Sequence, residues 1–242
     1  MSFGPGVPYE KLFSSRISDS TKKCTVLNSG VMGWGIREYL DLVENRIDKI
    51  KPEHVFMQYG MNDILYTGPE ESLRESKNTE YEKLGDRVYF FLKAHFQDTH
   101  NYLRTRSYLY VWIVGLSKAK WRMHFRVYEK AWRDERMVSS YFQKVLRIKA
   151  ILKERHIGLT FIIIPFAGQV LEPPEPHDYP FVDIDQLVPF LEKHSIPYIS
   201  FVEPFMGQHN AYIHGDPYHL SQYGHELVAQ KILQTIQHAN SE

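Results

Sequence analysis

The stretch VFMQYGMND, residues 55–63, joins a mostly apolar run to a glycine and then to two polar residues. A short run of this kind that ends at a glycine turn is typical of a strand buried on both faces of a sheet. Similar runs are CTVLN, LTFIIIP and IPYISF. The sequence therefore predicts strands at residues 24–28, 55–59, 159–165 and 196–201.

Helical patterns lie between these predicted strands. Apolar residues recur at helical spacing over residues 36–47, 138–156 and 184–194, and a last helix is expected over about 222–238 with Ser221 as its N-cap. Strands that alternate with helices indicate a parallel, doubly wound sheet covered on both faces. We therefore expect an α/β fold, a three-layer α/β/α sandwich with a flavodoxin-like sheet.

Length and charge limit the classes of function. The 242 residues fit one large domain, residues 1–242. The 29 Lys and Arg balance the 29 Asp and Glu, so no overall field favours nucleic acid or an anionic membrane. No apolar run approaches the roughly 20 residues of a membrane helix, and we expect no integral membrane segment.

Residues 65–136 have no strand signal and are expected to form a helical insertion in the domain. Within it, residues 117–136 interleave basic and aromatic side chains, a pattern also found in surfaces that bind nucleic acid. Because the total charge is neutral, we interpret this stretch as an amphipathic helix that packs Trp121, Phe125 and Tyr128 inward.

No sequence pattern indicates a cofactor or a metal. The glycines at residues 30–35 do not match G-x-G-x-x-G, and no phosphate-loop lysine follows them. The single cysteine, Cys24, excludes an intrachain disulfide and a multi-cysteine zinc site. The histidines near the C-terminus lack carboxylate partners at zinc-ligand spacing: His209, His214 and His225. We expect neither cofactor nor metal.

Polar stretches follow two predicted strands and precede the last helix. Gly33 can bring its backbone N–H close to a ligand, although such turns also use glycine for steric reasons. Asn62 can either cap the following helix or offer its amide to an oxyanion. Asp216 lies three residues before His219, so its carboxylate can accept from one imidazole nitrogen and leave the other to act as a base.

The order of these blocks resembles the SGNH/GDSL hydrolase superfamily of serine esterases and acylhydrolases. The matching blocks are G-x-x-G at 30–33, G-x-N-D at 60–63 and D-x-x-H-L at 216–220. The N-terminal SFGPGV is similar to the T-F-G-x-G-V pattern that follows the family's G-D-S motif. The resemblance covers most of the chain outside residues 65–136. It implies that Gly33 and Asn62 are oxyanion donors, that His219 is the general base, and that Asp216 orients it.

The G-D-S motif itself does not occur in the 242 residues. By the family's register, the nucleophile lies two residues before Ser2, and we expect Met1 to be an internal residue of a longer G-D-S-M-S-F-G-P-G-V stretch. Ser2 is not expected to substitute, because a flexible terminus cannot hold its hydroxyl within reach of His219. The first strand is central in this architecture, so without it the neighbouring strands have unpaired backbone groups.

The resemblance implies hydrolysis of a carboxylic ester through an acyl-serine intermediate, with no cofactor. The expected partner is a small-molecule or carbohydrate ester, with acetyl on a carbohydrate favoured over long lipid chains. The alternative is a non-catalytic SGNH-like module that binds an acyl or sugar ligand, or an inactive fragment. A phosphate or flavin binder of the flavodoxin type is a third interpretation, which rests on fold class alone.

Overall fold

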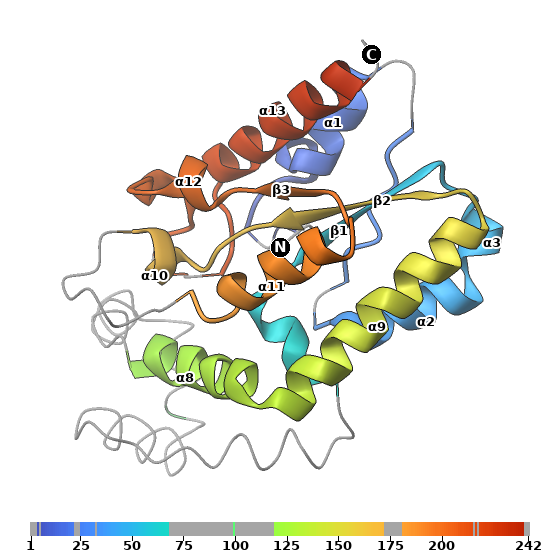
Figure 1. Cartoon of the computed structure of the whole chain (residues 1–242). Coiled ribbons are helices and arrows are strands. Elements are labelled where there is room, and N and C mark those ends of the chain that lie inside the picture. The colour runs from blue at the N-terminus through green and yellow to red at the C-terminus, as the bar shows by residue number, and fades with distance from the viewer. Residues whose placement is uncertain are drawn as a thin grey trace.

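The computed structural model of the chain describes residue 4 and residues 6–21, 25–31, 33–67, 99, 119–171, 181–214, 216 and 218–239. Within these residues, one parallel sheet has the strand order β1-β2-β3, formed by β1 (His54–Tyr59), β2 (Gly158–Ile163) and β3 (Tyr198–Ser200) (Figure 1). The first two strands pair over their full length, with His54 opposite Gly158 and Tyr59 opposite Ile163. The structure thus confirms an α/β fold with a parallel sheet and the predicted strands at 55–59, 159–165 and 196–201.

Helices connect and cover the strands. Along the chain they are η1 (Tyr9–Lys11), α1 (Phe13–Ser20), α2 (Ile36–Asn45), α3 (Ile47–Ile50), η2 (Met61–Tyr66), α8 (Ala119–Arg133), α9 (Glu135–Glu154), α10 (Ala167–Val170), α11 (Ile184–Lys193), α12 (Val202–Phe205), η3 (His209–Ala211) and α13 (Gln222–Ala239). The predicted helices at 36–47, 138–156, 184–194 and 222–238 are confirmed. Ser221 caps α13 as expected, since its Oγ accepts a hydrogen bond from Gly224 N at 3.2 Å.

The side chains of the sheet alternate between two faces, each covered by helices (Figure 1). Tyr59, Phe161 and Ile163 join a buried cluster with α2, α8, α9 and α11. Ile162 and Ile199 point the other way and join a second cluster with α1 and α13. The core therefore lies on both sides of the strands.

The described end of the predicted insertion is part of the first core cluster. In α8, Phe125 is 1% exposed and Trp132 is 0% exposed. Tyr128 is half-buried on the same helix, which confirms the expected inward packing of these aromatic residues. The side chain of Trp121 and residues 68–98 and 100–118 lie outside the described part of the chain. The final helix of this segment is thus a component of the core.

The predicted strand at residues 24–28 is wrong for the residues that the structure describes. Residues 25–28 have no strand assignment, and Leu27 is 65% exposed. Cys24 lies outside the described residues. A strand is held by backbone hydrogen bonds to a neighbour, and the described residues provide no neighbour for this segment. A suitable local pattern alone cannot form a ladder.

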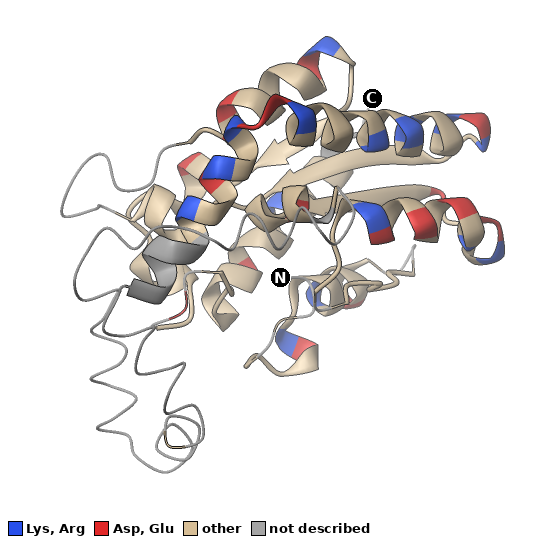
Figure 2. Ribbon diagram, turned by 90° about the horizontal axis from the view of Figure 1, so that it is seen from below, with Lys and Arg blue, Asp and Glu red and all other residues tan. Residues whose placement is uncertain are grey.

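Basic and acidic residues both lie along the helices in the ribbon view of Figure 2. Ion pairs on the surface join α9 and the residue after it to α2 and α3, through Arg147 with Glu44 at 3.2 Å and Arg155 with Asp48 at 2.7 Å. Among the helices of the described ranges, we find none with the length and apolar character needed to cross a membrane.

Candidate active site

His219 and Asp216 form a hydrogen-bonded pair in the loop before α13. The distance between His219 Nδ1 and Asp216 Oδ2 is 2.7 Å. The other carboxylate oxygen accepts from the backbone N–H groups of Tyr218 and His219, at 2.9 and 3.1 Å. Partial burial by itself raises the pKa of Asp216, but the bonds from His219 and Tyr218 outweigh it, so the pKa lies below its usual value. Asp216 therefore stays ionised and holds the ring in one orientation.

The backbone around this pair is a closed loop attached to the sheet. Tyr212 and Leu220 form an antiparallel bridge, and Ile213 N donates to His219 O at 3.0 Å. Tyr212 OH donates to Pro165 O at 2.8 Å, just beyond the carboxyl end of β2. The pair is thus fixed at the edge where open α/β sheets place their ligands.

Asn62 lies in η2, directly after β1. Its side chain is half-buried and makes no hydrogen bond with a described residue, so it does not cap η2. That structural role belongs to its neighbour Asp63, whose Oδ2 accepts from Gly60 N at 3.0 Å. A Cβ added at Gly60 would lie 2.9 Å from Asn62 Oδ1, so glycine at this position leaves room for the observed Asn62 side chain. The capping alternative for Asn62 is therefore wrong, and its amide has no structural partner within the described residues.

Asp63 is a buried carboxyl, with only 3% of its surface exposed. Burial raises its pKa to about 7, against the lowering effect of the bond from Gly60 N. Shifted pKa values are common at functional sites, so the raised pKa of Asp63 supports the Asn62 turn as a candidate site. The sequence alone did not indicate this shift.

Gly33 lies on the turn before α2 and is exposed. Its φ of +83° is in the region that favours glycine, and a Cβ there would meet nothing within 4 Å. Its backbone conformation therefore favours glycine, although no described atom would clash with a side chain there. No hydrogen bond between described residues joins Gly33 or Asn62 to His219, so their assembly into one site stays a prediction.

Helix α8 contacts both the Asn62 turn and the His219 loop. Trp132 Nε1 donates to Met61 O at 3.0 Å. One helical turn earlier, the ring centroid of Tyr128 lies 6.2 Å from that of Tyr218. Tyr218 also packs on Phe166 beyond β2, with centroids 4.9 Å apart. The two candidate regions therefore share one supporting helix at the carboxyl end of the sheet.

A buried polar network, missed at the sequence level, ties the strand ends together. Asp183 is 1% exposed and accepts from Tyr59 OH at 2.6 Å and from Gln169 Nε2 at 2.9 Å. Gln169 Oε1 in turn accepts from Phe166 N at 2.7 Å. Burial raises the pKa of Asp183, although these bonds act to lower it. The residues of this network are far apart in sequence, and the sequence pattern places Tyr59 in a mostly apolar strand. No local pattern therefore indicates the network.

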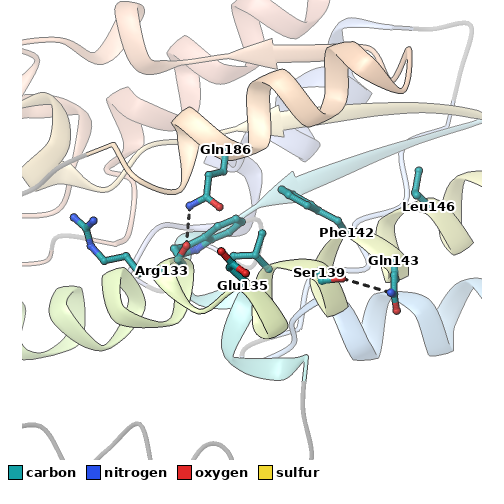
Figure 3. A pocket seen from close by; sticks show the side chains of 9 residues that line it. Arg133, Glu135, Ser139, Phe142, Gln143, Leu146 and Gln186 are labelled. Carbon is teal, nitrogen blue, oxygen red and sulfur yellow. Dashed lines mark hydrogen bonds between the residues drawn. The ribbon is translucent and has the colours of Figure 1, made fainter.

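A separate open pocket of about 420 Å³ lies between α11 and the junction of α8 and α9 (Figure 3). Trp132 and Phe142 supply its apolar lining, and Gln186 Nε2 donates to Trp132 O at 2.7 Å. None of the candidate catalytic residues lines it. It therefore does not provide the substrate site that the sequence predicts.

Within the part of the chain that the structure describes, no group of three or more His, Cys, Asp or Glu residues is placed to hold a metal ion. Ser2 lies outside this part.

A comparison with models of known protein families gives no match, and neither does a comparison with curated proteins.

Proposed function

We propose that this chain carries the base and the oxyanion donors of an SGNH-type serine ester hydrolase with a three-layer α/β/α fold. The observation that carries the proposal is the 2.7 Å contact between Asp216 Oδ2 and His219 Nδ1. In a neutral ring whose Nδ1–H donates to the carboxylate, Nε2 has the free lone pair that a general base requires. No described residue forms a hydrogen bond with that nitrogen.

The proposed reaction is acyl transfer to a serine and then to water. His219 Nε2 takes the serine hydroxyl proton as the oxygen bonds to the ester carbonyl carbon. The carbonyl oxygen becomes an oxyanion, which accepts from Gly33 N–H and Asn62 Nδ2. His219 then gives its proton to the leaving alcohol as that C–O bond breaks. A water, deprotonated by the same nitrogen, hydrolyses the acyl-serine.

The nucleophile belongs to the G-D-S segment that the resemblance places two residues before Ser2. Ser14 and Ser15 are buried in α1, which packs on α13, and Ser29 lies in the turn that carries Gly33, so we do not expect these three serines to substitute. We propose that the substrates are small acyl esters, such as acetyl groups on a carbohydrate.

The test compares hydrolysis of p-nitrophenyl acetate by this chain and by the same chain extended with Gly-Asp-Ser before Met1, preceded by an apolar strand. We expect turnover from the extended chain only. His219→Ala in the extended chain lowers kcat by at least about 10³-fold, as expected for loss of a triad base. His209→Ala removes an exposed histidine from the same region and is the matched control, with unchanged kcat.

Equal activity of His219→Ala and His209→Ala would contradict the proposal. A lower rate with p-nitrophenyl octanoate than with the acetate supports the small-acyl preference, and the reverse order would contradict it.

The alternative is a non-catalytic module that binds an acyl or sugar ligand. It is favoured by the absence of a G-D-S serine from the 242 residues beside an intact Asp216–His219 pair. It predicts that acetate or an acetylated sugar shifts the NMR signals of His219 and Asn62 while no turnover occurs, even in the extended chain.

A further inference from the structure

The phenol of Tyr39 lies between the two turns that carry Gly33 and Asn62. Tyr39 is half-buried in the first turn of α2, and its OH donates to Trp34 O, the carbonyl of the residue after Gly33, at 3.4 Å. The same phenol is hydrogen-bonded to the carboxyl of Asp63, the residue after Asn62. One side chain therefore contacts both turns.

Helix α2 is bonded to the Gly33 turn by its side chains and by its backbone. Glu38 Oε2 accepts from Gly35 N at 3.0 Å, and Tyr39 N donates to Gly35 O at 3.0 Å. The helix also packs against η2, which contains Asp63. The phenol thus belongs to a helix that contacts both turns, so a change in its bonds can pass from one turn to the other.

The hydroxyl of Tyr39 has one proton for two acceptors. Trp34 O can only accept, and an ionised Asp63 can also only accept. A carboxylate is the stronger acceptor of the two, so the proton then points to Asp63 and Trp34 O loses its donor. The long distance of 3.4 Å to Trp34 O agrees with a hydroxyl that is shared in this way.

Protonation of Asp63 changes the number of donors. One carboxyl oxygen still accepts from Gly60 N, at 3.0 Å, while the other donates its proton to the oxygen of Tyr39. The hydroxyl of Tyr39 then donates to Trp34 O, and both bonds form at once. Only the protonated carboxyl therefore gives a continuous chain of hydrogen bonds from the Asn62 turn to the Gly33 turn.

The surroundings of Asp63 bring its ionisation close to neutral pH, since burial raises its pKa to about 7. Helix α8 contacts this turn through Trp132, which carries no charge, and Lys144 of α9 donates to Thr67 O after η2. Titratable side chains that interact with the carboxyl come from three elements: Glu38 and Tyr39 of α2, Tyr59 of β1 and Tyr141 of α9.

We propose that Tyr39 is a positioning residue that joins the Gly33 turn to the Asn62 turn while Asp63 is protonated, and releases the Gly33 turn when Asp63 ionises. On ionisation the proton of Asp63 passes to solvent, and the hydroxyl of Tyr39 turns from Trp34 O to the carboxylate. The role of the two turns as oxyanion donors rests on the proposed function, whereas the exchange of hydrogen bonds does not.

The test follows the carbonyl carbon of Trp34 by NMR in the 242-residue chain from about pH 5 to about pH 9, because its chemical shift responds to loss of a hydrogen bond at the oxygen. The amide signal of Gly60 reports the ionisation of Asp63 in the same samples. We expect both signals to titrate with one midpoint, close to pH 7. A Trp34 carbonyl shift that stays constant while Gly60 titrates would overturn the proposal.

Two variants represent the two states. Asp63→Asn keeps an acceptor for Gly60 N and donates from its amide to Tyr39 at every pH, so the Trp34 signal should stay at the low-pH position of the wild type. Tyr39→Phe removes the hydroxyl, so the Trp34 signal should stay at the high-pH position while Gly60 still titrates. A Trp34 titration in Tyr39→Phe equal to that of the wild type would overturn the proposal.

Tyr141→Phe is the matched control. Tyr141 is buried in α9 and interacts with Asp63, but among the described residues it forms no hydrogen bond with Trp34. Its replacement should leave the coupled titration of Trp34 and Gly60 in place, and loss of the coupling in this variant would count against a role specific to Tyr39.

These measurements need no esterase activity. Absence of turnover in the serine-bearing extended chain would contradict the proposed function, while the titration of Trp34 would still decide whether Tyr39 joins the two turns.

Discussion

Replacement of Asp63 by Asn tests the most strongly perturbed carboxyl of the Asn62 turn. Asp63 is 3% exposed, and its Oδ2 accepts from Gly60 N at 3.0 Å. Asparagine has nearly the same shape and retains an oxygen that can accept this bond, but it cannot ionise. Asp63→Asn therefore removes the titration of the side chain while keeping its volume.

The sign of the effect follows from the raised pKa. Burial moves the pKa of Asp63 from 3.8 to about 7, so folding favours the protonated form. Below pH 4 the carboxyl is protonated in both the folded and the unfolded chain, so its full contribution to the free energy of unfolding is present. This contribution is lost as the pH rises to about 7. Three pH units at about 1.4 kcal/mol each correspond to about 4 kcal/mol. Relative to wild type, Asp63→Asn should gain up to this amount between pH 4 and pH 8.

Urea unfolding at several pH values between 4.5 and 8.5 measures this difference. Any other group that titrates in this range is present in both proteins, so its effect cancels when the variant is subtracted from wild type. Asp48→Asn is the control, since Asp48 is exposed and its bond with Arg155 lowers its pKa. Its difference from wild type should be constant above pH 5.

A difference between Asp63→Asn and wild type that stays constant from pH 4.5 to 8.5 would refute the reasoning. It would mean that the carboxyl is solvated or paired in solution and ionises at its ordinary pKa.

Further predictions concern the proposed site and its support. Asp216→Asn in the serine-bearing extended chain should lower kcat about 10²- to 10⁴-fold with little change in KM, because His219 loses its orienting anion; steady-state kinetics measure this. Gly60→Ala should displace Asn62, whose Oδ1 lies 2.9 Å from the added carbon, and lower kcat in the same assay about 10²-fold. Trp132→Phe leaves a buried carbonyl of the same turn without its donor and should lower the free energy of unfolding by about 1–3 kcal/mol, measured with urea.

Sequence patterns predicted the elements that depend mainly on local interactions or that consist mostly of apolar residues. The run at residues 159–165 is buried on both faces as β2, which is the burial its composition predicts. The same kind of prediction failed at residues 25–28, although Val26 and Leu27 are apolar. A strand needs a partner as well as a suitable composition, and the partner lies elsewhere in the sequence. Pattern alone could not distinguish the two runs.

Long-range polar contacts were the other limit of prediction. The Tyr59–Asp183 bond joins residues 124 positions apart, and Trp132 donates to a carbonyl 71 positions away. No periodicity encodes such pairs. They also explain why the end of residues 65–136 is core: its last helix satisfies a buried carbonyl of the Asn62 turn and fills the space beside Tyr59.

The members of the candidate site depend on the sheet to different degrees. The pair of Asp216 and His219 is separated by three residues and fixed by backbone N–H groups of its own loop, so its geometry is local. Gly33 instead follows residues 25–28, which have no strand neighbour among the described residues. The geometry of Asp216 and His219 is therefore held by their own loop, whereas no hydrogen bond within the described residues holds Gly33 itself.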